Sequence, residues 1–163
     1  MNGKSKDDYY LEIATNVSKR SSCTRRKFGA VLVKDDNILS TGYNGSVRKA
    51  HNCGKELACL KDIKNEPHYT SYINCPAVHA EANAVLNAAR LGVSTIGTIC
   101  YLGVTGGQRS GPCQGCRRIL LNAGVEKIIY YDLLGDTIVE SRKDWIDKEN
   151  KWMEDREGDR DEV

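Results

Sequence analysis

Apolar and polar residues alternate at two different spacings over the first 43 residues. Apolar side chains at helical spacing predict a helix over residues 7–21, and its buried positions are expected to be Tyr10, Ile13, Ala14 and Val17. Residues 29–34 and 38–43 are rich in β-branched and other apolar residues, which is typical of strands. The polar residues 35–37 between them predict a turn, so the two strands form a hairpin.

The rest of the chain alternates between predicted helices and strands. Helices are expected over 79–91, ended by Gly92, over 113–123, ended by Gly124, and over 143–155; strands are expected over 98–104 and 125–131. Two loops separate them, a long polar one at 44–78 and a glycine-rich one at 105–111. A 35-residue loop is unusual in a small domain, so something must tie it down or it carries function. This order predicts an α/β protein with helices layered on both faces of a sheet.

Length and charge limit the classes of protein that this chain can be. Its 163 residues suit one domain, 1–163, with a core over about 8–132 and a C-terminal helix and acidic tail over 143–163. The net charge of +2 is too small to argue for nucleic-acid binding. No apolar run reaches 18 residues, and the polar start lacks a signal sequence, so we expect no membrane span and a cytoplasmic protein.

Cysteine and histidine provide the candidate chemistry. An odd count of seven cysteines without a secretory signal favours metal binding or catalysis over a disulfide framework. Two short motifs stand at predicted helix starts, His79-Ala80-Glu81 and Pro112-Cys113-Gln114-Gly115-Cys116. Alone, the first motif is commonly a solvated helix end, and the second is equally a redox pair or half of a structural zinc site.

The two motifs together indicate a catalytic zinc centre. Cysteines three apart on one helical turn reach the same ion, and His79 supplies a third ligand from another helix. Three protein ligands leave one coordination position open for water, whose pKa the ion lowers. Glu81, two residues after His79, is then placed to move protons without being a ligand. This combination, H-x-E followed by P-C-x-x-C, is the signature of zinc deaminases.

The chain resembles the cytidine and deoxycytidylate deaminase superfamily, and most closely its deoxycytidylate (dCMP) deaminase branch. The resemblance covers about residues 8–132 and is carried by the two motifs together with Ser22–Arg26, Phe28–Lys34, Ile38–Gly45, His79–Ala84 and Ile119–Gly124. It implies a three-layer α/β/α fold with a central mixed five-stranded sheet. It also implies hydrolysis of dCMP to dUMP and ammonia, with zinc on His79, Cys113 and Cys116 and with Glu81 as the proton shuttle.

The resemblance extends to substrate and effector sites. Asn44 would lie at the pocket rim and bond the sugar or base, and the backbone N–H of Ala80 would help to fix the water or base. In allosteric relatives the stretch Gly42-Tyr43-Asn44-Gly45 is associated with dCTP activation and dTTP inhibition of a hexamer, so a homo-oligomer is expected. A plain turn is the alternative for Asn44-Gly45, because both residues tolerate positive φ.

A second group of possible metal ligands lies mostly in the 44–78 loop. It comprises Cys23, His51, Cys53, Cys59, His68 and Cys75. A structural zinc would supply the constraint that this long polar segment needs, and some relatives hold one with cysteines at positions like Cys23 and Cys53. Buried thiols and exposed histidines are the alternative. Cys100, within a predicted strand, is expected to be a core thiol.

A nucleotide substrate requires a phosphate site. Arg25 and Arg26 are the first candidates, with a solvated charge run as the alternative; the rivals are Arg109, Arg117 and Arg118, with help from the backbone of Gly106 and Gly107. Residues 103–111 are longer and richer in glycine than in many relatives, which leaves the substrate open between dCMP, dCTP, cytidine and a base in RNA. A non-catalytic zinc-stabilised module, closed by four ligands, is the remaining alternative.

Overall fold

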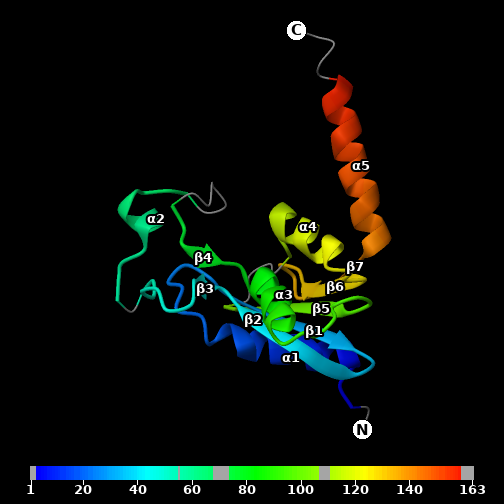
Figure 1. Ribbon diagram of the computed structural model, residues 1–163, viewed down its shortest axis with the longest axis horizontal. Coiled ribbons are helices and arrows are strands. Elements are labelled where there is room, and N and C mark those ends of the chain that lie inside the picture. The colour runs from blue at the N-terminus through cyan, green and yellow to red at the C-terminus, as the bar shows by residue number, and fades with distance from the viewer. Residues whose placement is uncertain (1–2, 55, 68–73, 107–110, 159–163) are drawn as a thin grey trace.

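The computed structural model describes residues 3–54, 56–67, 74–106 and 111–158, without the side chains of 156–158 (Figure 1). Its elements in chain order are α1 (Lys6–Ser18), β1 (Lys27–Lys34), β2 (Asn37–Tyr43), β3 (Gly45–Ser46), α2 (Leu60–Ile63), β4 (Ala77–Val78), α3 (Ala80–Arg90), β5 (Ile99–Thr105), α4 (Gln114–Asn122), β6 (Lys127–Tyr131), β7 (Thr137–Ser141) and α5 (Arg142–Gly158). Within the described residues, no helix is long and apolar enough to cross a membrane.

Five strands form the central sheet, in the order β2-β1-β5-β6-β7. β1 runs antiparallel to both β2 and β5, β5 and β6 are parallel, and β7 is antiparallel to β6. The sheet is therefore mixed and five-stranded, which confirms the expected fold class.

Helices cover both faces of this sheet (Figure 1). On one face α1 buries Tyr10, Leu11 and Ala14 against Val31 and Tyr101. The opposite face is covered by α3 and α4, and its core comprises Ala30, Leu32, Ala80, Ala84, Cys100, Leu102, Leu120, Leu121, Val125, Ile128, Tyr130 and Trp145. Successive β1 residues alternate between the two cores because strand side chains point to opposite faces. The three-layer arrangement and the core position of Cys100 are confirmed.

Some elements differ from the sequence prediction. The hairpin turn has two residues, Asp35 and Asp36, both at positive φ, as in the turns that match the twist of paired strands. α1 ends at Ser18 rather than at residue 21. At this end the Ser18 hydroxyl donates a hydrogen bond to the Thr15 carbonyl. β7 was not predicted at all, and it forms the edge of the sheet beside β6.

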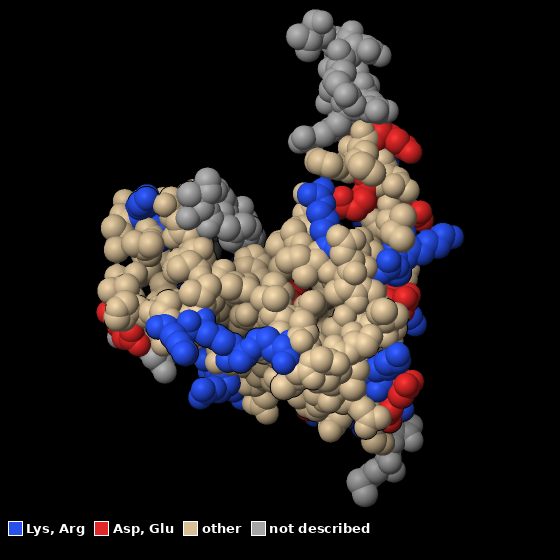
Figure 2. All heavy atoms as spheres, in the orientation of Figure 1, with Lys and Arg blue, Asp and Glu red and all other residues tan. Residues whose placement is uncertain are grey.

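The long segment 44–78 is tied down by backbone pairing at its two ends. β3 and β4 form a small antiparallel sheet in which Gly45 opposes Val78. The segment also contains the short helix α2, and the molecular surface is indented between this part of the chain and helices α4 and α5 (Figure 2). α5 itself extends away from the three layers and carries charges of both signs (Figures 1 and 2).

Candidate metal centre

His79 and Glu81 are placed by the first turn of α3. His79 is the residue immediately before the helix, in extended conformation, and Glu81 is its second helical residue. Gly42 of β2 allows α3 to lie directly on the sheet: a Cβ at this position would be 2.3 Å from the Ala80 carbonyl oxygen and 2.3 Å from the Ala84 nitrogen. The two chemical groups of α3 are therefore fixed by backbone contact with β2.

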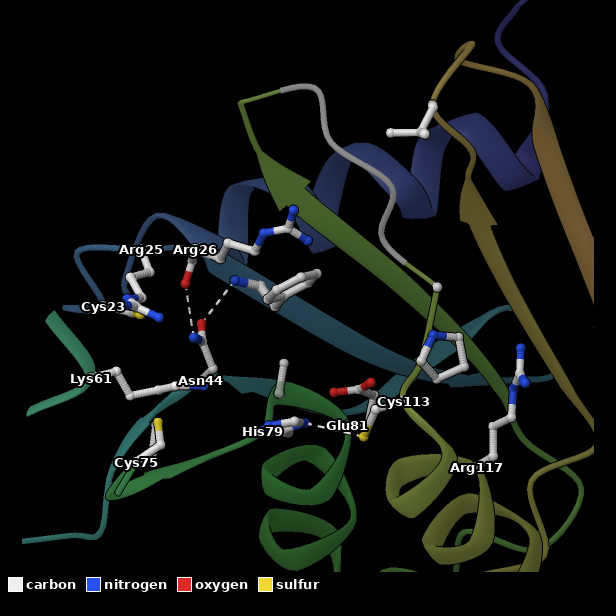
Figure 3. A pocket seen from close by; sticks show the side chains of 16 residues that line it. Cys23, Arg25, Arg26, Asn44, Lys61, Cys75, His79, Glu81, Cys113 and Arg117 are labelled. Carbon is white, nitrogen blue, oxygen red and sulfur yellow. Dashed lines mark hydrogen bonds between the residues drawn. The ribbon is translucent and has the colours of Figure 1, made fainter. Parts of the chain in front are cut away.

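Cys113 and Cys116 are placed by the first turn of α4. Cys113 caps this helix, and its sulfur accepts a hydrogen bond from the backbone N–H of Cys116 at 3.4 Å. The N-terminal ends of α3 and α4 thus meet at one place (Figure 3). Helix N-termini carry partial positive charge, which favours thiolates and a carboxylate there.

The distances between the three predicted ligands fit a zinc ion. His79 Nδ1 lies 3.5 Å from Cys113 Sγ and 3.3 Å from Cys116 Sγ. A tetrahedral zinc with ordinary Zn–N and Zn–S bonds separates nitrogen from sulfur by about 3.5 Å. Among the described residues, these three form the only set of three or more ligand atoms within 4.8 Å of one another. The set is the one that the sequence predicts.

Glu81 lies beside this set without belonging to it. Its side chain is 4% exposed, and its carboxylate accepts a hydrogen bond from the Cys116 thiol. Burial raises the pKa of Glu81 above its ordinary value. A carboxyl group with a raised pKa, next to three ligands that leave one position open, is suited to accept and return a proton near neutral pH.

The ionisation of Cys113 suits metal binding as well. Hydrogen bonds from Cys116 and His79 lower the pKa of the Cys113 thiol, and the hydrogen bond to Cys113 raises the pKa of His79. The Cys113 sulfur is therefore a thiolate in this environment. Thiolates and imidazole are the ligands that zinc prefers in proteins.

A cavity of about 540 Å³ opens over this centre. Of the sequence-predicted substrate residues, Arg25, Arg26, Asn44 and Ala80 line it, together with the rival candidate Arg117. Its wall also contains Lys61, which the sequence analysis did not select. The volume is within the range of small-molecule sites.

Two of the rival arginines contact acidic residues near the C-terminus. Arg117 reaches Glu140 at 3.0 Å, while Arg118 binds Glu149 at 2.9 Å and stacks on Trp152, outside the cavity lining. Gly106 has a φ of 102° at the end of β5. Arg109 and Gly107 lie outside the described residues.

Asn44 and its neighbours have structural contacts of their own. The Asn44 side chain accepts from the Phe28 backbone N–H at 2.8 Å and donates to the Arg26 carbonyl at 2.9 Å (Figure 3). It thereby fixes the backbone of Arg26 while facing the cavity. Tyr43 is partly exposed and Gly45 pairs in β3. Asn44 and Gly42 therefore have structural roles, in hydrogen bonding and in packing respectively.

Four of the six candidates for a second metal gather in one region. Burial, followed by the neighbouring thiols of Cys59, Cys23 and Cys75, raises the pKa of Cys53 to about 11. These sulfurs are neighbours but do not form a preassembled set of three within 4.8 Å. His51 is exposed and its Nδ1 lies 2.6 Å from a Glu56 carboxylate oxygen. The sixth candidate, His68, lies outside the described residues.

Comparison with known proteins agrees with this geometry. A family model described as the cytidine and deoxycytidylate deaminase zinc-binding region matches residues 4–132. The chain belongs to this family.

Similar proteins within the family carry deoxycytidylate deaminase names. A deoxycytidylate deaminase of Mycobacterium phage D29 is 36% identical over 76% of this chain and 92% of its own length. Another, from Schizosaccharomyces pombe, is 33% identical over 77% of this chain, which spans 36% of that longer protein. The crystal structure of dCMP deaminase from cyanophage S-TIM5 with dCMP and dUMP is 30% identical, with a TM-score of 0.61 over 80% of this chain and 85% of that one.

Proposed function

We propose that this chain catalyses the hydrolytic deamination of dCMP to dUMP and ammonia, as one domain spanning residues 1–163. The observation that carries the proposal is the three-ligand set His79, Cys113 and Cys116 beside a buried carboxyl group, at the floor of a nucleotide-sized cavity. The dCMP deaminase names of its relatives support the choice of substrate.

Glu81 carries the proton transfers in this reaction. A zinc ion on the three ligands would supply the Lewis acidity that makes water a nucleophile near neutral pH. The Glu81 carboxylate accepts one proton from the water that attacks C4 of cytosine and delivers it to N3. It then takes the proton of the new C4 hydroxyl group and delivers it to the amine, which leaves as ammonia when the C4–N4 bond breaks. The backbone N–H groups of Ala80 and Cys113, at the starts of α3 and α4, have no partner within their helices and can hold the water or base.

The proposal is tested by Glu81→Ala, assayed for ammonia release from dCMP and for zinc per chain. We expect zinc content to stay unchanged and kcat to fall by about 10²–10⁴-fold, the usual contribution of a general acid–base group. Turnover retained in the zinc-loaded variant would refute the role of Glu81.

The substrate is decided by a panel of deoxycytidine, cytidine, dCMP, dCTP and a cytosine-containing RNA. We expect kcat/KM to be highest for dCMP, because the cavity wall carries arginines that suit one phosphate group. A higher kcat/KM for dCTP or for the nucleosides would support the deamination reaction but refute dCMP as the preferred substrate.

Regulation, assembly and location form part of the proposal. By resemblance, dCTP activates and dTTP inhibits a homo-oligomer, a hexamer in allosteric relatives, through residues 42–45. Light scattering and kinetics with and without each nucleotide test this, and a monomer indifferent to both would overturn it. The reducing cytoplasm suits a chain none of whose seven cysteines is in a disulfide.

A second, structural zinc on Cys23, Cys53, Cys59 and Cys75 is a separate proposal. Gly54 packs on Ser22 and Thr24, where a Cβ would be 2.6 Å from atoms of both, so the 53–54 loop lies beside Cys23. Elemental analysis should find two zinc ions per chain in the unmodified protein and about one in Cys53→Ser. The control is Cys100→Ser, which changes a cysteine of the sheet core and should keep two zinc ions. One zinc in the unmodified protein would overturn this proposal.

A further inference from the structure

Arg117 connects the metal-binding turn of α4 to the C-terminal part of the chain. It is the fourth residue of α4, immediately after Cys116, and it lines the cavity over the metal centre. Its Nη2 donates to both carboxylate oxygens of Glu140 in β7, at 3.1 Å and 3.0 Å. Figure 3 shows Arg117 on the same side of the cavity as Cys113.

Glu140 is a buried carboxylate that β6 and α5 hold in place. It opposes Ile128 in the pairing of β7 with β6, so the central sheet fixes its backbone. From α5 it accepts hydrogen bonds from Lys148 Nζ at 2.9 Å and from Trp145 Nε1 at 3.0 Å. A buried charge is tolerated only with such partners, because an unpaired one is costly. Glu140 is therefore a fixed point to which the side chain of Arg117 is attached.

The turn that carries the two cysteines is weakly held by its own backbone. The N–H groups of the first turn of a helix have no carbonyl partners within the helix. Gly115, which is exposed, lies between Cys113 and Cys116, and glycine in a helix costs about 1 kcal/mol relative to alanine. Zinc ligands nevertheless have to keep their distances within about 0.2 Å. A contact from outside the helix would therefore help to hold this turn, and the bond of Arg117 to Glu140 is such a contact.

We propose that Arg117, held by Glu140, is a positioning residue for the zinc ligands Cys113 and Cys116. The guanidinium group keeps the turn that carries both sulfurs in place relative to the sheet before the ion binds. The inference rests on the zinc centre of the proposed function, but it does not depend on the substrate. Partners outside the ligand set of a metal typically change its affinity about 10- to 100-fold.

The next residue of α4 provides a matched comparison. Arg118 pairs with Glu149 of α5 at 2.9 Å, so this ion pair also joins α4 to the C-terminal helix. The Arg118 side chain is 46% exposed, against 23% for Arg117, and it does not line the cavity. Removing this second pair should therefore affect the contact between the two helices without affecting the zinc ligands.

The test is the zinc affinity of Arg117→Met, measured by competition with a chelator. This variant keeps the apolar stem and removes the guanidinium group. Cys116→Ser gives the signal of zinc bound elsewhere in the chain, which is subtracted. We expect the affinity of the centre to fall about 10- to 100-fold. Arg117→Lys should recover most of the loss, because a single nitrogen makes both contacts with Glu140. The control Arg118→Met should bind zinc as the unmodified protein does.

A double-mutant cycle separates positioning from general destabilisation. If Arg117 acts through Glu140, the variant Arg117→Met/Glu140→Gln should bind zinc no more weakly than Arg117→Met alone. The corresponding variant Arg118→Met/Glu149→Gln should keep the full affinity. If Arg117→Met folds poorly because the buried carboxylate loses a partner, the double variant, which removes both charges, replaces it in the comparison.

The measurement distinguishes failure of this inference from failure of the proposed function. If the unmodified protein binds zinc at this centre but does not deaminate dCMP, the proposed function fails, and the zinc affinities still test Arg117. Three results would overturn the inference: a zinc affinity of Arg117→Met equal to that of Arg118→Met, additive losses in the cycle, or an unmodified protein that binds no more zinc than Cys116→Ser.

Discussion

Replacing Gly42 by alanine tests whether close packing of α3 on β2 holds the metal centre together. The new Cβ would lie 2.3 Å from the Ala80 oxygen and from the Ala84 nitrogen, whereas ordinary contact begins at 3.4 Å. The helix must therefore move by about 1.1 Å, the difference of these distances. Both atoms belong to the backbone, so no side-chain rotation can relieve the clash.

Two losses are expected from this displacement. Overpacking typically lowers the free energy of unfolding by about 1–3 kcal/mol. Because the clash here is with backbone atoms, we expect a decrease at the upper end, about 3 kcal/mol. Because Ala80 lies between His79 and Glu81, both groups move with it. Metal–ligand distances tolerate only about 0.2 Å, and a misplacement of 1 Å can lower catalysis about 100-fold.

The assay is urea unfolding followed by tryptophan fluorescence, with zinc content and kcat/KM for dCMP measured on the same samples. Gly45→Ala is the matched control, since the nearest atom to its new Cβ is a Tyr43 ring carbon at 4.0 Å. It should unfold within about 1 kcal/mol of the unmodified protein and keep its zinc, because alanine mainly restricts the unfolded chain there. If Gly42→Ala matched this control in both stability and zinc, the packing argument would be wrong.

Three further variants test the groups that support the centre. Burial alone would raise the pKa of Glu140, but hydrogen bonds from Lys148 and Trp145 lower this pKa on balance. The charged Glu140 therefore stabilises the fold at any pH above its pKa in the unfolded chain, about 4.3. This stabilisation is lost as the pH falls through the lower pKa of the folded protein. The difference in urea midpoint between the unmodified protein and Glu140→Gln should thus narrow from pH 5 to pH 3; a widening gap would contradict it. Trp145→Ala should cost about 3–5 kcal/mol in thermal unfolding, because this side chain is 1% exposed, whereas Trp152→Ala, 39% exposed, should cost less than about 1 kcal/mol. Cys116→Ser should release zinc to a chromogenic chelator much faster than the unmodified protein does, and equal release rates would argue against Cys116 as a ligand.

The metal centre could be predicted from the sequence because its geometry is local. His79 and Glu81 share one helical turn, as do Cys113 and Cys116, so spacing alone places each pair. What spacing does not specify is that the two helix starts meet. That follows from the order of the strands and from the contact of Gly42 with α3, and only the family resemblance anticipated it.

The features missed by the sequence analysis depend on contacts between distant segments. β7 is a five-residue edge strand with alternate residues exposed, and its pairing with β6 is not visible in its own composition. Lys61 stands in a polar segment where lysine is ordinarily solvated, and its burial comes from the fold around it. His51 was selected for its proximity to cysteines in the sequence, and the contact of its Nδ1 with Glu56 is likewise not visible in the sequence.

The placement of charge in the cavity explains how one pocket can orient a nucleotide. At one side lie the sulfurs of Cys113 and Cys116 and the carboxyl group of Glu81, beside two helix N-termini that would share with a bound zinc the stabilisation of negative charge there. At the other side the cations Arg25 and Lys61 lie beside the carboxylates of Asp62 and Glu66. The guanidinium group of Arg25 on the second side suits a phosphate, which would leave the neutral base to face Glu81. On the proposed function, removing the cations should therefore weaken orientation as well as affinity, and dCMP should then behave as deoxycytidine does.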